Sequence, residues 1–154
     1  MKKIFVAILC IALALSLVSC AEEPVTLDLT ALSTQISAAD VFADDLQPIE
    51  ASRIGELVGL DLAGCKSSEY HMGSGATGEE FGLFECNSVD DAKALVKQLE
   101  EHRDSLLETY KSYAPDAVPR IENAVISRLG QNVAFVTADD YASAQSIVDG
   151  VFKK

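Results

Sequence analysis

The sequence contains no tryptophan, only two histidines, and half as many basic as acidic residues. Without tryptophan, and with few other aromatic residues, it offers little surface on which a sugar ring could stack. The formal net charge of −12 opposes binding to nucleic acid. The sequence also lacks a Cys-x-x-Cys pair, which argues against a zinc knuckle and a thioredoxin-type site. These absences point away from nucleic-acid partners, cofactors and metals.

The first twenty residues have the pattern of a lipoprotein leader. Lys2 and Lys3 precede an uncharged apolar run over residues 4–15. This run is shorter than the roughly 20 residues of a transmembrane helix and is typical of a secretory signal. Leu17-Val18-Ser19-Cys20 has the form of a bacterial lipobox, whose cysteine is acylated and becomes the first mature residue. We therefore predict a signal peptide at 1–19, a lipidated Cys20 with a short acidic tether at 20–28, and one domain at 29–154.

Cleavage of this leader would remove two basic residues and leave a mature charge of about −14. A domain of that charge is repelled by anionic lipid head groups, so the predicted membrane contact is the lipid on Cys20. We expect the protein on the outer face of the cytoplasmic membrane. About 135 residues would remain, enough for a single domain with a sizeable core.

Hydrophobic spacing and turn residues predict four helices and two β-hairpins. The first helix follows Asp28 and buries Leu29, Leu32 and Ile36, and the second runs from Pro48 to Gly59 and buries Leu57. The third runs from Ser88 to Pro115, with an apolar stripe that ends in Tyr113. The fourth follows Asp139 and buries Tyr141. The hairpins have arms at 66–71 and 79–86, and at 121–128 and 133–138. Residues 133–136 are continuously apolar, which indicates a covered, central strand.

This order, α-α-β-β-α-β-β-α, predicts an α+β fold. We expect a two-layer sandwich in which the helices cover one face of a four-stranded, mainly antiparallel sheet.

The glycine-rich stretch 73–78 matches Gly-x-Gly-x-x-Gly, the spacing of dinucleotide-binding loops. In such loops the glycines open a helix whose N-terminus faces the phosphates. Here a strand is predicted to follow, and Glu79 and Glu80 would stand where phosphate binds. We therefore interpret the stretch as a flexible turn.

Other polar residues give weak signals. His71 and His102 have no matching set of metal ligands, and we find no Gly-x-Ser-x-Gly motif or legible triad. The acidic pairs lack the spacing of a calcium loop, although the pair at 44–45 could hold a weakly bound cation. Tyr110 and Tyr113 end the apolar stripe of the long helix, either as core residues or as the wall of a ligand pocket.

Cys65 and Cys86 are candidates for a disulfide across the first hairpin. A register that sets them opposite each other centres the turn between Gly75 and Ala76. The same register creates three favourable cross-strand pairs: Lys66 with Glu85, Tyr70 with Phe81, and His71 with Glu80. Directly opposed residues have Cα atoms about 4.5–5.5 Å apart, within the span of a disulfide. Two reduced thiols are the alternative.

Several passages together carry a family resemblance. They are the lipobox, residues 56–61 (ELVGLD), residues 110–116 (YKSYAPD), and residues 121–126 (IENAVI) before a Gly-x-x-Val strand. Over most of residues 25–152 the chain resembles a domain-of-unknown-function family of small, uncharacterised lipoproteins from Gram-positive bacteria. The resemblance implies a surface lipoprotein and transfers no catalytic residue; the two cysteines of the hairpin are not part of it.

We weigh two classes of function and predict the first, a protein that is not an enzyme. The first is a non-enzymatic binding or interaction module of the cell envelope, whose partner is an envelope protein or a small solute. The second is a small envelope hydrolase or redox protein. A cleft that joins His71 to acidic residues would favour an enzyme, whereas an apolar patch without convergent polar groups would favour an interaction module.

Overall fold

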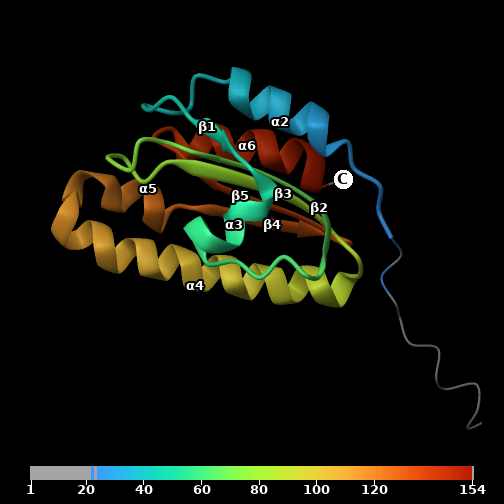
Figure 1. Cartoon of the computed structure of the whole chain (residues 1–154). Helices are drawn as coiled ribbons and strands as arrows, with labels where there is room; N and C mark the ends of the chain where they lie inside the picture. The colour runs from blue at the N-terminus through green and yellow to red at the C-terminus, as the bar shows by residue number, and fades with distance from the viewer. Residues whose placement is uncertain (1–21, 23, 154) are drawn as a thin grey trace, which may run out of the picture.

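A computed structural model describes residue 22 and residues 24–153 (Figure 1). The predicted signal peptide at 1–19 and the lipidation site Cys20 lie outside the described residues. Among the helices that are described, none combines the length and apolar character needed to cross a membrane.

The described chain is an α+β domain, as predicted. Its elements are α2 (Leu29–Ala38), β1 (Gln47–Ile49), α3 (Ala51–Val58), β2 (Cys65–Met72), β3 (Glu80–Cys86), α4 (Val89–Tyr113), the 3-10 helix η2 (Pro115–Ala117), α5 (Val118–Glu122), β4 (Val125–Leu129), β5 (Asn132–Thr137) and α6 (Tyr141–Phe152).

Local capping chemistry fixes most helix boundaries. The carboxylate of Asp28 accepts a hydrogen bond from the Ala31 N–H at 2.9 Å, and the Ser88 hydroxyl accepts one from the Asp91 N–H at 3.1 Å. Gly59 ends α3 with a φ of 83°, a left-handed conformation that glycine adopts without strain. These caps are confirmed. The cap of α6 is Asp140 rather than Asp139, because the Asp140 side chain reaches the Ser143 N–H.

The sheet has five strands, all antiparallel, in the order β1-β2-β3-β5-β4. The prediction of four strands in the order α-α-β-β-α-β-β-α is therefore wrong, because β1 was missed and because α5 takes the first residues of the strand predicted at 121–128. Pro48, predicted to start a helix, lies in β1 opposite His71. A proline has no N–H to donate and is tolerated in an edge strand, where one side of the backbone has no neighbour.

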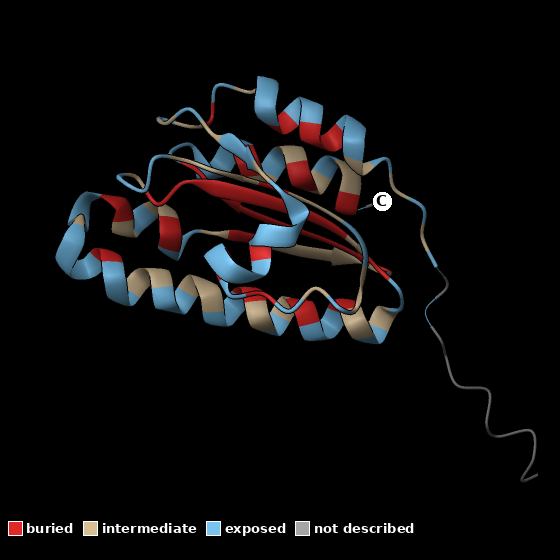
Figure 2. Ribbon diagram, in the orientation of Figure 1, coloured by how far each residue is buried: buried red, intermediate tan, exposed pale blue. Residues whose placement is uncertain are grey.

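Helices cover both faces of the sheet, so the predicted two-layer arrangement is also wrong (Figures 1 and 2). Helices α2 and α6 pack on one face, and α3 and α4 pack on the other. The cause is that β3 and β5 are apolar on both sides: Phe81 and Leu83 face α2 and α6, whereas Phe84 faces α3 and α4. The prediction that residues 133–136 form a covered strand is confirmed, since every residue of β5 is buried.

Three side chains expected inside are exposed: Leu57, Tyr113 and Tyr141. Each lies at the margin of its helix's apolar stripe, where helical spacing alone does not determine which way the residue faces.

The first hairpin pairs Cys65 with Cys86 as predicted, but a bulge follows at Lys66. The bulge shifts the register by one residue, so Tyr70 lies opposite Gly82 and His71 opposite Phe81. The predicted pairs of these two residues are therefore wrong. The shift places the Tyr70 ring over a residue without a side chain, and a Cβ atom on Gly82 would lie 2.7 Å from that ring. The ion pair of Lys66 with Glu85 forms nevertheless, at 2.8 Å.

Candidate functional site

The two cysteines lie at the end of the hairpin where β2 begins and β3 ends. Their sulfur atoms are 3.6 Å apart and form no covalent bond in this structure. Cys86 is buried and Cys65 is partly exposed. The hydrogen bond from the Cys86 thiol lowers the pKa of Cys65, whereas the same contact and burial raise the pKa of Cys86. The register thus brings the predicted partners together, and the bond itself stays a prediction.

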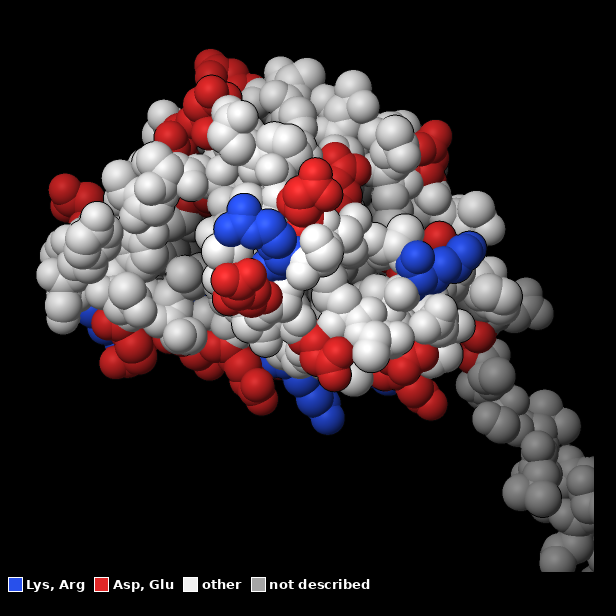
Figure 3. All heavy atoms as spheres, viewed as in Figure 1, with Lys and Arg blue, Asp and Glu red and all other residues white. Residues whose placement is uncertain are grey.

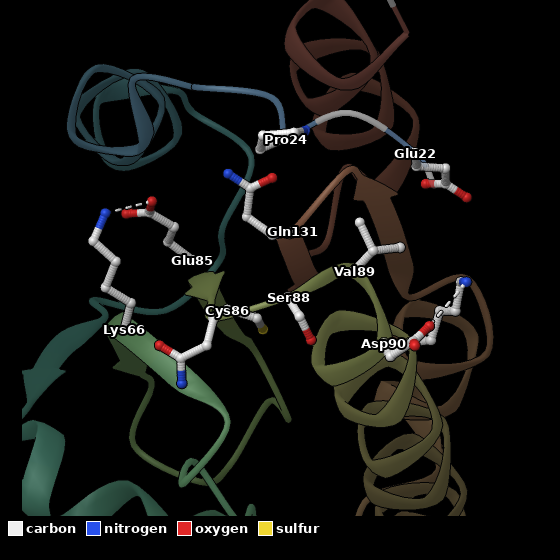
Figure 4. A pocket seen from close by; sticks show the side chains of 11 residues that line it. Glu22, Pro24, Lys66, Glu85, Cys86, Ser88, Val89, Asp90 and Gln131 are labelled. Atoms are coloured by element: carbon white, nitrogen blue, oxygen red, sulfur yellow. Dashed lines mark hydrogen bonds and ion pairs between the residues drawn. The ribbon is translucent and has the colours of Figure 1, made fainter. Parts of the chain in front are cut away.

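A hollow of about 620 Å³ lies beside Cys86 (Figure 4). Its walls are the N-terminal residues Glu22 and Pro24, the ends of β2 and β3, the first turn of α4, and Gln131 of the β4–β5 turn. The charged side chains around it are paired: Lys66 with Glu85, and Lys93 with Asp90 at 3.2 Å. Because these charges neutralise one another, the hollow offers a polar contact surface rather than an activated nucleophile or base.

A second polar cluster, at the opposite end of β3, is built on Glu79. Its carboxylate is buried and accepts hydrogen bonds from the backbone N–H groups of Ala43 at 3.0 Å, Asp44 at 2.8 Å and Asp139 at 2.8 Å. The guanidinium of Arg120 lies 4.0 Å away and also bonds to Asp139. Three hydrogen-bond donors and one guanidinium, from three distant segments, therefore meet at one carboxylate, which indicates a structural role.

Hydrogen bonds from the glycine-rich loop to Asp44, and from Tyr110 to the loop, hold the loop in place. One Asp44 oxygen accepts hydrogen bonds from the N–H and hydroxyl of Ser74, both at 2.7 Å, and from the Thr77 hydroxyl at 3.1 Å. The Ser74 hydrogen bonds hold the pKa of Asp44 below its usual value. Tyr110 donates its hydroxyl to the Gly75 carbonyl at 2.6 Å, so it serves as a buried anchor of the loop. The loop joins β2 to β3 and opens no helix.

A small hollow of about 140 Å³ is lined by His71, Asp44 and Asp45, the combination that would favour an enzyme. In it Asp44 accepts hydrogen bonds from the glycine-rich loop, and Asp45 accepts one from the Gln47 amide at 3.0 Å. Among residue 22 and residues 24–153, no group of three or more His, Cys, Asp or Glu side chains is placed to hold a metal ion.

The predicted pairing of His71 with Glu80 is wrong. His102 of α4, rather than His71, contacts Glu80, with Nε2 2.6 Å from Oε1. Both side chains of this pair are almost fully buried, with exposed fractions of 11% and 3%. The bulge at Lys66 explains the difference, because it turns His71 onto the opposite face of the sheet, where its ring stacks on Phe81.

On that opposite face, Ser33, Glu69 and His71 form a chain of hydrogen bonds. Glu69 accepts from the Ser33 hydroxyl and contacts Nε2 of His71 at 2.9 Å. The carboxylate, rather than the imidazole, lies in the middle. A nucleophilic serine needs the histidine next to its hydroxyl, so this order does not activate Ser33.

The Tyr70 hydroxyl is buried beside the Glu80–His102 pair and has no hydrogen-bond partner among the described residues. Burial raises the pKa of Tyr70 well above its ordinary value, and the charge of Glu80 raises it further. A buried hydroxyl without a partner destabilises the fold by roughly 1–3 kcal/mol.

We therefore expect Tyr70→Phe to increase the free energy of unfolding by about 1 kcal/mol at neutral pH. Above about pH 10 the unfolded chain ionises this tyrosine while the folded chain does not, so stability falls with rising pH. Tyr70→Phe should make that alkaline loss shallower, whereas Tyr113→Phe, at an exposed position, should change neither quantity. Urea unfolding between pH 7 and 11 measures both. An unchanged alkaline slope in Tyr70→Phe would contradict the assignment.

The fold and the site together define a small, acidic α+β domain whose polar side chains mostly bond to one another. The chain belongs to the DUF4358 family, a domain of unknown function, which it matches over residues 39–138. The predicted membership in a domain-of-unknown-function family is thus confirmed, over a shorter region than the resemblance across 25–152. No curated protein and no solved structure matches the chain.

Proposed function

We propose that this chain is a lipid-anchored, non-enzymatic interaction module of the cell envelope. In this proposal it is a lipoprotein of a Gram-positive bacterium, held through Cys20 on the outer face of the cytoplasmic membrane. The observation that carries the proposal is Leu17-Val18-Ser19-Cys20, which follows a basic start and a short apolar run.

The contacts of the N-terminal segment support a short tether. Val25 bonds to the β4–β5 turn through Gln131 at 3.0 Å and Asn132 at 2.7 Å, and Glu22 pairs with Arg128 at 2.8 Å. Val25 is the fifth residue after Cys20, which allows a reach of at most about 16–18 Å. The hollow beside Cys86 lies at this end of the domain and would be close to the bilayer (Figure 4).

The polar clusters support binding rather than catalysis. Glu79 is saturated by backbone donors, Glu80 is paired with His102, and the Ser33 hydroxyl bonds to a carboxylate. Acidic side chains are spread over the face drawn in Figure 3, with basic ones between them only at isolated places. A protein partner suits such a surface, and a small solute passed to a transporter is the other kind of partner we consider.

The anchor is tested by intact mass of the protein extracted from its own membranes. We expect loss of residues 1–19 and an added lipid mass, and release of Cys20→Ala into the soluble fraction. Cys65→Ala is the matched control and should stay membrane-bound. Firm membrane attachment of Cys20→Ala would contradict the proposal. Affinity capture of the wild-type protein from these membranes, with mass spectrometry, then tests for a protein partner; its absence from every capture would count against an interaction module.

A thiol–disulfide role is a second candidate, favoured by the 3.6 Å contact of the two sulfurs and the lowered pKa of Cys65. A thiol with a lowered pKa that is partly exposed forms a thiolate more readily and enters disulfide exchange.

Whichever role applies, we expect Cys65 and Cys86 to form a disulfide when the protein is treated with glutathione disulfide. The two thiols give up two protons and two electrons, and the glutathione disulfide is reduced to two glutathiones. The bond should raise the free energy of unfolding by roughly 3 kcal/mol, by restricting the unfolded chain. Urea unfolding with and without reductant measures this, and Cys65→Ser with Cys86→Ser should be insensitive to reductant. Full alkylation of both thiols in denaturant after the oxidation would show that the bond does not form.

A further inference from the structure

The two edges of the sheet differ in how they are protected. Strand β1 has three residues and includes Pro48, features that discourage pairing with another chain. Strand β4 has five residues, no proline, and a single neighbour, β5. An edge of this kind is a template for a further strand.

The register identifies which backbone groups of β4 are free. Leu129 pairs with Asn132 across a two-residue turn, so this pair exchanges hydrogen bonds, and the bonded pairs then alternate along the ladder. Ile126 and Arg128 fall at the non-bonded positions, and their N–H and C=O groups point away from β5. No described residue bonds to these four groups.

A hollow of about 470 Å³ runs beside this edge, between β4 and α4. Val96 and Ile126 supply its apolar part. Three of its lining residues are basic, Lys93, Lys97 and Arg128, and one is acidic, Glu100. Lys93 pairs with Asp90 and Arg128 with Glu22, so Lys97 is the basic side chain here that has no ion-pair partner among the described residues. In a chain with twice as many acidic as basic residues, this is a local concentration of basic side chains.

A carboxylate already binds at this edge. Glu22, from the chain's own N-terminal segment, forms an ion pair with Arg128, while Lys97 has no ion-pair partner among the described residues. A second copy of the chain paired along β4 would bring its own lysines and arginine against these charges, which opposes self-pairing.

We propose that the β4 edge binds an extended, acidic segment of a partner protein as a sixth strand. This inference rests on the proposed role as a protein-interaction module. The partner's backbone would pair with Ile126 and Arg128, as in other strand-addition complexes. Its alternate side chains would face α4, where an apolar one contacts Val96 and an acidic one reaches Lys97.

The test uses the intact chain in a non-ionic detergent and a fluorescent peptide of alternating valine and glutamate. We expect binding by fluorescence anisotropy that weakens as salt rises. We also expect slower hydrogen–deuterium exchange in peptides covering 125–129. Lys93→Glu with Lys97→Glu should weaken binding about tenfold or more, whereas Lys111→Glu, on the same helix, should leave it unchanged. A valine–lysine peptide and an N-methylated valine–glutamate peptide should each bind at least about tenfold more weakly.

Several outcomes would overturn the proposal. They are no binding of the valine–glutamate peptide, equal binding of its N-methylated form, and protection from exchange elsewhere than at β4. Protection of the Ile126 and Arg128 amides in the free chain would show that a second copy or the chain's own N-terminal segment fills the edge. Binding of phosphatidylglycerol vesicles by the Cys20→Ala chain, lost in the double lysine variant, would assign the charges to lipid instead. Capture of the same envelope protein by wild-type and double-variant chains would exclude this edge while the proposed function stands.

Discussion

Replacing Glu79 with alanine is expected to lower the free energy of unfolding by about 3–5 kcal/mol. The variant leaves the N–H groups of Ala43, Asp44 and Asp139 without their acceptor and removes the carboxylate beside Arg120. These donors come from the segment between α2 and β1 and from the segment between β5 and α6, so the variant removes three hydrogen bonds that join both segments to the start of β3.

Two further variants separate this effect from that of an ordinary surface carboxylate. Glu79→Gln retains one acceptor oxygen and should lower the free energy of unfolding by about half as much as Glu79→Ala does. Glu85→Ala removes a partly exposed ion pair with Lys66 and should cost less than about 1 kcal/mol. Urea unfolding followed by circular dichroism measures all three. A cost for Glu79→Ala no larger than that for Glu85→Ala would refute the structural role.

Replacing His102 with leucine is expected to cost about 3–5 kcal/mol, because Glu80 would keep its buried place without a partner. Replacing both Glu80 and His102 with leucine should recover much of the lost stability, because two apolar side chains of similar volume fill the same space without a buried charge. The buried Glu80 carboxylate therefore destabilises the fold when it has no partner, and it does so much less when His102 pairs with it.

The matched control for this prediction is His71→Leu. His71 also contacts a glutamate, but Glu69 is 41% exposed and keeps the Ser33 hydroxyl as a donor. Replacing His71 with leucine should lower the free energy of unfolding by less than about 1.5 kcal/mol, because the leucine still packs on Phe81. Urea unfolding at neutral pH compares the variants. If the double leucine variant is less stable than His102→Leu alone, the account of the buried pair is wrong.

Elements decided by their own residues were predicted from the sequence. Asp28 and Ser88 accept hydrogen bonds from the first turns of their helices, and Gly59 ends α3 in a left-handed conformation. In each case the residues that mark the start or end of the helix lie within four or five positions of one another, so the helix boundary can be predicted without any distant contact. Cys65 lies opposite Cys86 as predicted, but the bulge at Lys66 creates this pairing, because the pairs nearer the turn are offset from the predicted register by one residue.

Strand β1 and the bulge at Lys66 could not be predicted in this way. Three residues that include Pro48 become a strand only because β2 pairs with them. The bulge at Lys66 goes with a register in which Tyr70 packs over Gly82, a contact between two strands that neither strand's own pattern reveals. One extra residue then turned His71 away from Glu80, which changed the identity of the buried pair.

The sequence by itself determined the caps of α2, α3 and α4, the places of the two hairpins along the chain and the burial of β5, because these follow from contacts between near neighbours and from hydrophobic spacing. The tertiary structure alone decided that helices cover both faces, that Glu79 gathers three backbone donors, and that His102 rather than His71 meets Glu80. Each of these joins groups far apart along the chain. Their positions are set by which faces pack together and by a single shift of register, and both are fixed only when the whole core closes.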